Sequence, residues 1–92
     1  MKMKFKNIIG PNDGLLLQTG QGYLYRVVIN NPDGNNGTVE LYDSLTISSN
    51  SIGKISLGNA VASNVYECDC TFENGLYVVT TGNNLDITVV YE

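Results

Sequence analysis

The sequence predicts an all-β protein, a single antiparallel β-sandwich of about eight short strands with a jelly-roll or related Greek-key topology. Its 10 glycines and 12 asparagines tolerate the left-handed backbone of tight turns. Residues that favour strands (Val, Ile, Thr, Tyr, Phe) are abundant, whereas good helix formers are scarce. Turn clusters recur at roughly the 8–12-residue spacing that is typical of sandwiches and barrels.

Seven turn clusters divide the chain into eight segments. No segment combines helix caps with a 3.6-residue apolar repeat, so we expect no helix. The segment 51–57 is the least regular, because Gly53 in its middle indicates a bulge. The clusters are Gly10–Gly14, Gly20–Gly22, Asn30–Gly37, Ser48–Ser51, Gly58–Asn59, Glu73–Gly75 and Gly82–Asn84.

Alternation with a period of two predicts which side of each strand is buried. In the first segment an apolar side alternates with three lysines, and in the others an apolar side alternates with polar or smaller side chains. The predicted buried sides are Met3, Phe5 and Ile9; Tyr23, Tyr25, Val27 and Ile29; Val39 and Leu41; Tyr66, Cys68, Cys70 and Phe72; and Leu85, Ile87, Val89 and Tyr91.

A chain of 92 residues forms one domain, which we expect to span residues 1–92. A domain of this size buries only one modest core, so many small domains gain further stability from disulfides, metals or oligomerisation. Oligomerisation is therefore attractive before any motif is considered.

The charge of the chain is unevenly distributed. The net charge is −4, yet Lys2, Lys4 and Lys6 supply three of the five cationic side chains. An acidic body repels phosphate backbones, so we expect no nucleic-acid partner. The lysines are interpreted as solvated charges that discourage sheet-to-sheet aggregation, with contact to an acidic partner as the alternative.

The N-terminus begins like a signal peptide, but Lys6 and Asn7 interrupt it. No apolar run approaches the roughly 18–20 residues of a membrane span, so we expect no membrane partner. These features predict a protein that is made and folded in a cytoplasm.

The residues that carry catalysis or bind metals are scarce. Cys68 and Cys70 could hold a soft metal, but a tetrahedral site needs two more N or S ligands, and the chain has no other Cys and no His. They are interpreted as small core residues. Glu67 and Asp69, about 7 Å apart on a strand, fit the spacing of an inverting glycosidase pair but are expected to be solvated. We therefore expect no enzyme, no cofactor and no metal site.

The stretch from Asn31 resembles a calcium-binding loop only in part. Its sixth residue is Asn36 where the loop needs Gly, and its twelfth is Tyr42 where it needs Glu. A type I turn at residues 31–34 is the simpler interpretation, with an adventitious cation site as the alternative.

Six tyrosines are the remaining informative residues. Tyr42, Tyr77 and Tyr91 are candidate interface residues, because an apolar ring with a polar tip suits half-exposed contacts. Tyr23, Tyr25 and Tyr66 are expected to line the core or its rim. The alternative for each is ordinary sandwich packing with the hydroxyl in water.

Four segments together resemble small virion proteins of tailed bacteriophages, which are β-sandwiches of capsid decoration or cement type. They are GYLYRVVINN, GTVELYDS, TFENGLYVVTTG and LDITVVYE. The resemblance implies an accessory structural protein on the virion, made in the bacterial host cytoplasm, with a trimer favoured and the major capsid protein or another virion protein as partner. It also implies that Gly75 sets a turn and that Asp43 closes the strand of Leu41. The alternative function is a carbohydrate- or receptor-binding module of a fibre or tail.

Overall fold

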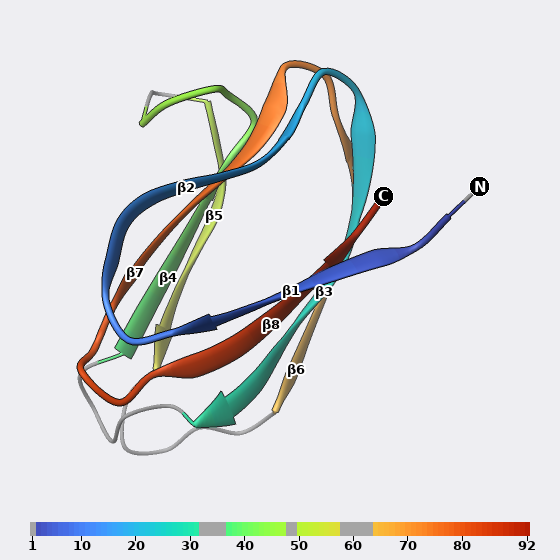
Figure 1. Ribbon diagram of the computed structural model, residues 1–92. Helices are drawn as coiled ribbons and strands as arrows, with labels where there is room; N and C mark the ends of the chain where they lie inside the picture. The colour runs from blue at the N-terminus through green and yellow to red at the C-terminus, as the bar shows by residue number, and fades with distance from the viewer. Residues whose placement is uncertain (1, 32–36, 48–49, 58–63) are drawn as a thin grey trace.

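The computed structural model describes residues 2–31, 37–47, 50–57 and 64–92, and in this part of the chain it contains eight strands and no helix (Figure 1). Within it, therefore, nothing helical is long and apolar enough to cross a membrane. The strands are β1 Lys4–Ile9, β2 Asn12–Thr19, β3 Gly22–Asn31, β4 Gly37–Tyr42, β5 Ser51–Leu57, β6 Val65–Phe72, β7 Gly75–Thr81 and β8 Asp86–Tyr91.

The strands form two antiparallel four-stranded sheets that pack face to face (Figure 1). The first sheet has the order β1-β8-β3-β6 and the second the order β2-β7-β4-β5. The chain passes from one sheet to the other at every connection except that between β4 and β5. This arrangement is a jelly roll, so the predicted fold class is confirmed.

The core lies between the two sheets and is almost entirely aliphatic. The strands of both sheets contribute alternate residues to the core, because successive side chains of a strand point to opposite faces of its sheet. The side chains of the core that are least exposed are Leu24, Val27, Val39, Leu41, Leu57, Phe72, Leu76, Val78, Leu85, Ile87 and Val89. The predicted buried sides of β4, β6 and β8 are thereby confirmed, with Tyr66, Cys68 and Cys70 half-buried against the core.

The predicted buried side of β3 is wrong at its first half, because a bulge intervenes. The pairing of β3 with both of its neighbours shifts between Leu24 and Arg26. A bulge adds one residue and moves the following side chains to the other face. Leu24 is therefore buried along with Val27 and Ile29, while Tyr23 and Tyr25 are only half-buried and lie outside the core.

The predicted buried side of β1 is also wrong. Met3, Phe5 and Ile9 are 55%, 73% and 69% exposed, and Ile8 is the strand's buried residue. Ile8 lies opposite the buried Ile87 of β8, and opposite residues of a ladder share a face. The register with β8 therefore puts the apolar side of β1 on the outer surface of the first sheet.

The same register puts the lysine side of β1 at the inner rim of the sandwich. Lys4 lies opposite Tyr91, its Nζ is 5.7 Å from the centroid of that ring, and it donates a 3.1 Å hydrogen bond to Gln18 Oε1 of β2. A lysine stem covers apolar surface while its ammonium group stays in water. β1 thus uses Ile8 and a lysine stem on its inner side.

Most predicted turns coincide with the ends of strands. The Gly10–Gly14 cluster is an exception, since β2 begins at Asn12 and only two residues, with Gly10 at φ 77°, separate β1 from β2. The irregularity expected near Gly53 is confirmed, because the pairing of β4 with β5 skips one residue there. The predicted turn and calcium-loop alternative at 31–34, and the turn at Gly58–Asn59, fall largely or wholly outside the described residues.

Candidate interaction surfaces

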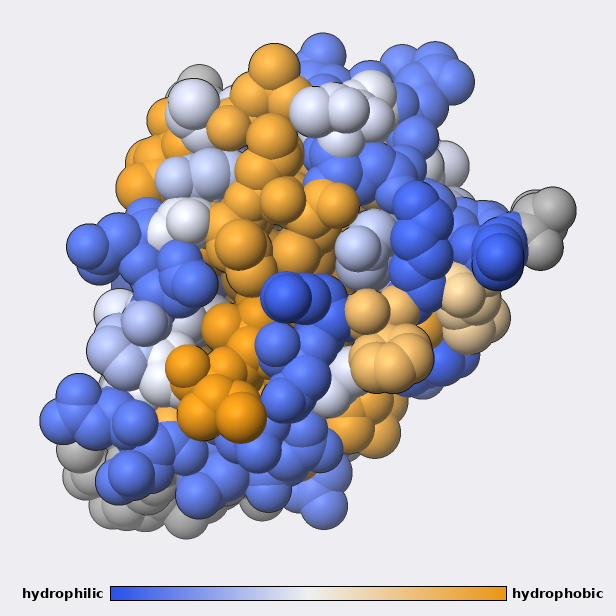
Figure 2. All heavy atoms as spheres, viewed as in Figure 1, coloured by the Kyte–Doolittle hydropathy of each residue, from blue (hydrophilic) through white to orange (hydrophobic). Residues whose placement is uncertain are grey.

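The most conspicuous surface feature is the outer side of β1. Met3, Phe5 and Ile9, here called the β1 apolar side, stand on one face of a strand that has a partner on one edge only, at the end of its sheet. Figure 2 shows apolar surface on the side of the molecule where β1 and β2 cross in front of the sandwich. On this side Asn7 stands between Phe5 and Ile9 and donates to Asp86 Oδ1 at 2.7 Å, so the exposed apolar residues are a Met3–Phe5 pair with Ile9 beyond it. Single exposed apolar residues are normal, whereas neighbouring ones can mark an interaction site.

The outer face of the first sheet carries apolar and polar side chains together. Phe5 of β1 lies opposite Val90 of β8. Two residues before Val90, Thr88 of β8 lies opposite Val28 of β3, and Val28 lies opposite Val65 of β6 on its other side. Val65 at the far edge is 39% exposed. Polar side chains share this face, since Asn7 and Asn30 both donate hydrogen bonds to Asp86 Oδ1 (2.7 and 3.1 Å).

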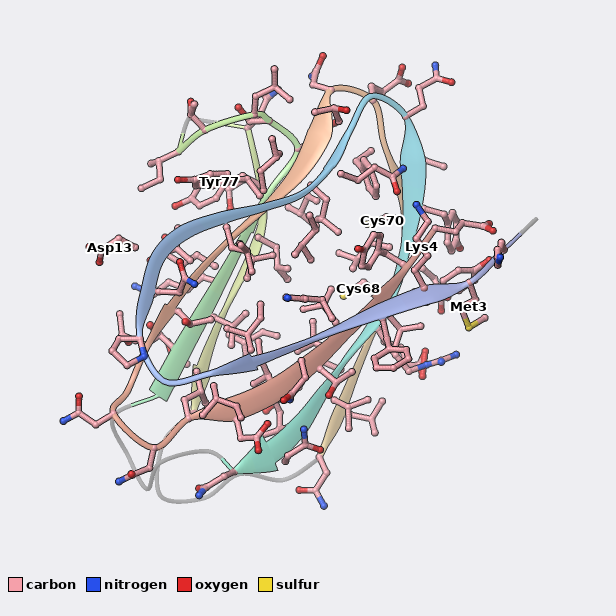
Figure 3. All side chains as sticks on the ribbon, in the orientation of Figure 1. Met3, Lys4, Asp13, Cys68, Cys70 and Tyr77 are labelled. Atoms are coloured by element: carbon pink, nitrogen blue, oxygen red, sulfur yellow. The ribbon has the colours of Figure 1, made fainter. Side chains whose placement is uncertain are left out.

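Two of the three candidate tyrosines lie side by side on the second sheet. Tyr42 of β4 is opposite Tyr77 of β7. Tyr42 is only 8% exposed and its hydroxyl donates to Glu40, a hydrogen bond that raises the pKa of the tyrosine above its usual value. Tyr77 is half-buried and its ring covers Gly14 of β2, where a Cβ atom would overlap the tyrosine hydroxyl (Figure 3).

Tyr91 does not join them. It is on the inner side of β8 in the first sheet, 8% exposed, beneath Lys4. The half exposure expected of all three residues is found only at Tyr77, and the expectation is wrong for Tyr42 and Tyr91. Sequence reasoning erred here because it judged tyrosines by type, whereas the register decides which of them reach the surface.

The sandwich is open between β5 and β6, the last strands of the two sheets. A groove of about 570 Å³ lies there, lined by Leu41, Ile52, Gly53, Lys54, Ile55, Tyr66, Glu67, Cys68, Cys70 and Thr71. Its lining is about equally apolar and polar. Ile52, Ile55 and the alternate residues of β6 supply the apolar part, and Lys54, Glu67 and Thr71 supply the polar part. Side chains of β6 therefore take part in both the core and an accessible groove.

Both cysteines are free and half-buried on the inner side of β6 (Figure 3). Partial burial raises the pKa of each thiol, and the neighbouring Cys70 raises that of Cys68 further. Within the described residues no group of three or more His, Cys, Asp or Glu side chains is arranged to hold a metal. The prediction that the cysteines pack against the core is confirmed.

The two carboxylates of β6 point outward as predicted. Glu67 accepts a 3.2 Å hydrogen bond from Arg26 Nε, and the Arg26 and Glu67 side chains of this ion pair are 34% and 54% exposed. Asp69 is exposed and has a positive φ of 47° at the bulge of β6. Paired with arginine or left in water, these carboxylates resemble surface groups, and the expectation of no enzyme stays a prediction.

Sequence reasoning missed the role of Asp43. This residue follows β4, and its two carboxylate oxygens accept hydrogen bonds from the backbone N–H groups of Glu73 (3.0 and 3.1 Å) and Asn74 (2.8 Å). Partial desolvation works to raise its pKa, but hydrogen bonds from Asn74, Glu73 and Gly75 outweigh it and hold the pKa below its usual value. Asp43 therefore fixes the turn between β6 and β7.

Gly75 is also explained by packing rather than by the turn itself. A Cβ atom there would lie 2.9 Å from the carbonyl oxygens of Gln18 and Ser44. Because the backbone of three segments meets at this point, only glycine fits.

Comparisons with protein-family models and with curated proteins find no match. Among solved structures, the chain is similar to the Drosophila NLP-core, whose crystal structure provides insight into pentamer formation and histone binding. The identity is 14%, the TM-score 0.60, and the similarity covers 97% of this chain and 96% of that one. A C-terminal CBM6 of LamC, from Zobellia galactanivorans, gives 14% identity and a TM-score of 0.33 over 95% of this chain and 69% of that one. The first similarity concerns the fold alone.

Proposed function

We propose that this protein is an accessory structural subunit of a phage virion, a head decoration or cement protein that binds the capsid surface and other copies of itself. The single observation that carries the proposal is the β1 apolar side, where Met3, Phe5 and Ile9 are each more than half exposed. A 92-residue domain with a modest core has little reason to leave this surface in water unless a partner covers it.

The position of this surface favours assembly. β1 is a terminal strand of the first sheet, and edge strands are where further chains add to a sheet. The jelly roll is a fold of viral capsid and lectin domains, which agrees with the resemblance of four segments to phage virion proteins. The lack of an evident catalytic group among the described residues is compatible with a structural role.

The number of copies is open to direct measurement. The resemblance to phage proteins favours a trimer, whereas the NLP-core, similar in fold and length, is a protein that forms pentamers. Closed rings of either order need an interface in which different surfaces of each copy meet. Light scattering coupled to size exclusion distinguishes a trimer from a pentamer.

The test has two parts. The purified chain should have the mass of an oligomer, and it should co-sediment with assembled shells of the matching major capsid protein. A monomer that leaves those shells unlabelled would refute the proposal. The alternative function, carbohydrate or receptor binding, is tested separately with a glycan array.

A further inference from the structure

We propose that Cys68 and Cys70 together form a two-coordinate binding site for a soft monovalent metal ion of the Cu(I) type, in the groove between β5 and β6. A tetrahedral site at these cysteines fails for lack of ligands, but a two-coordinate ion needs no others. The site lies on β6, at the opposite edge of the first sheet from β1, so it is separate from the surface that carries the proposed function.

The two thiols stand on one side of one strand. Residues two apart on a strand point to the same face of its sheet. Both cysteines are free, half-buried and packed against the core from the inner side of β6 (Figure 3). Burial and then the neighbouring Cys70 raise the pKa of the Cys68 thiol, so the two sulfur atoms are close enough to influence each other.

The thiols can also be reached from solvent. Both line the groove of about 570 Å³. β5 and β6 are the last strands of their sheets, so no further strand in the described part of the chain closes this end of the sandwich. Polar side chains, Lys54 and Thr71 among them, line the groove beside apolar ones, so it admits water and a hydrated ion. The two cysteines therefore differ from fully enclosed core residues, which no ion reaches.

The number and kind of ligands select the class of ion. Thiolates are preferred ligands of soft ions such as Cu(I). Structural zinc sites and iron–sulfur clusters need four protein ligands. Among the described residues, however, no group of three or more His, Cys, Asp or Glu side chains is arranged to hold a metal. A soft monovalent ion is satisfied by two thiolates in a nearly linear arrangement, so a pair of cysteines without a third ligand fits this ion.

The spacing of the two cysteines agrees with this choice. Residues two apart on a regular strand are about 6.6 Å apart. Asp69, with its φ of 47°, makes the strand irregular between them but leaves both thiols in the lining of the groove. Metal–thiolate bonds are about 2.3 Å long, so a linear site needs sulfur atoms about 4.6 Å apart. Rotation of the two side chains toward each other is therefore enough to form the site.

Binding exchanges two protons for the ion. Each thiol releases its proton to the solvent, two sulfur–metal bonds form, and neither the sulfur nor the metal changes its oxidation state. The complex of two thiolates with one monovalent ion carries a single negative charge. Lys54 of β5 supplies a cation in the same groove, and the carboxylate of Glu67 is already paired with Arg26. These two cations offset the charge of the complex.

The first experiment titrates the reduced protein with Cu(I), without oxygen and in competition with a chromophoric Cu(I) chelator. The wild type should bind one ion per chain, which native mass spectrometry counts directly. Cys68→Ser and Cys70→Ser each remove one thiolate while nearly keeping the size of the side chain. Each should bind the ion at least about a hundredfold more weakly, since even partners outside the ligand shell contribute about 10–100-fold.

Met3→Leu is the matched control. Met3 is 55% exposed, and its thioether is a soft ligand outside the groove. This variant should keep the wild-type affinity for Cu(I). Circular dichroism of each variant shows whether it remains folded. The proposal would be overturned by a wild type that takes no ion from the chelator, by serine variants that bind as tightly as the wild type, or by one ion shared between two chains.

A second readout needs no substitution. Ag(I) has the same preference for thiolates and is stable in air, so it replaces Cu(I) in a chloride-free buffer. One equivalent of Ag(I) per chain should slow the alkylation of both thiols of the wild type by iodoacetamide at least about tenfold. Protection of only one thiol by one equivalent, or unchanged rates at both, would show that the two sulfur atoms do not share an ion.

Discussion

Asp43, at the end of β4, is hydrogen-bonded to the turn from β6 to β7. Replacing it by alanine or asparagine removes or weakens these hydrogen bonds, here called the Asp43 turn bonds. In the wild type, both carboxylate oxygens accept backbone N–H bonds from Glu73, and one also accepts the bond from Asn74. Alanine removes all of these bonds. Asparagine removes the charge and one of the two acceptor oxygens while keeping the shape of the side chain.

The expected loss follows from the number and kind of bonds. Hydrogen bonds to a charged group contribute about 1.5–3 kcal/mol each when buried, and less where water competes. Asp43 is only half-buried, so we expect Asp43→Ala to lose about 2 kcal/mol of unfolding free energy and Asp43→Asn about 1 kcal/mol. For a domain of this size, a loss of 2 kcal/mol lowers Tm by about 8–16 °C.

The assay is urea unfolding followed by circular dichroism at one protein concentration, since association couples to stability. Asp13→Asn, at an exposed aspartate of β2, is the control and should change the unfolding free energy by less than about 0.5 kcal/mol. If Asp43→Asn and Asp13→Asn unfold at the same urea concentration, the Asp43 turn bonds contribute nothing to the free energy of unfolding, and the reasoning is refuted.

The pH dependence gives a second check on Asp43. Its pKa is lower in the folded protein than the ordinary value of 3.8. The contribution of its charge is therefore present above the unfolded pKa and is lost as the pH falls through the folded pKa. The stability difference between wild type and Asp43→Asn should be constant from pH 5 to pH 7 and should shrink below about pH 4. A difference that grows on acidification would contradict the assignment.

Three further predictions concern packing, a buried hydroxyl and the thiols. Gly22→Ala should lower the free energy of unfolding by about 2–3 kcal/mol, because a Cβ atom there would lie 2.3 Å from both the Glu92 carbonyl oxygen and the Phe72 ring. Gly53→Ala is the control, since Gly53 has open space around it, and this variant should be close to neutral in the same urea assay. Thr80→Val should lower the free energy of unfolding by about 1–2 kcal/mol, because the buried Thr80 hydroxyl donates a 2.9 Å hydrogen bond to the Gly10 carbonyl. A Tm equal to that of the wild type would contradict this prediction. Because burial raises the thiol pKa of Cys68 and Cys70, alkylation of the chain by iodoacetamide should still accelerate above pH 9, and a rate that levels off below pH 8 would show that the thiols ionise readily.

The sequence was sufficient to predict the fold class and the inner residues of β8, because no bulge interrupts that strand. Leu85, Ile87, Val89 and Tyr91 alternate without a break and are all buried. In β3 the same reasoning failed at Tyr25, since a strict period of two cannot foresee the one-residue bulge between Leu24 and Arg26.

The wrong prediction of the buried side of β1 has a different origin. Alternation shows that Met3 and Phe5 share a side, but not which side meets the core. That choice is made by Ile8, which breaks the lysine series and pairs with the fully buried Ile87 near the start of β8. The exposed apolar side, which carries the proposed function, is therefore visible only once the register is known.

The Asp43 turn bonds could not be predicted from the sequence for a third reason. Its partners, Glu73 and Asn74, lie 30 and 31 residues further along the chain. A local pattern identifies an aspartate at the end of a strand, but the topology of the jelly roll decides which turn it reaches.

The measurement that tests the central claim most directly is the mass of the purified wild-type chain in solution, by light scattering over a range of concentrations. The chain has a mass of 10.0 kDa. Self-association through the β1 apolar side predicts a discrete multiple of that mass, which falls to that of one chain in Phe5→Asp. A wild-type mass of one chain at every concentration would contradict the claim.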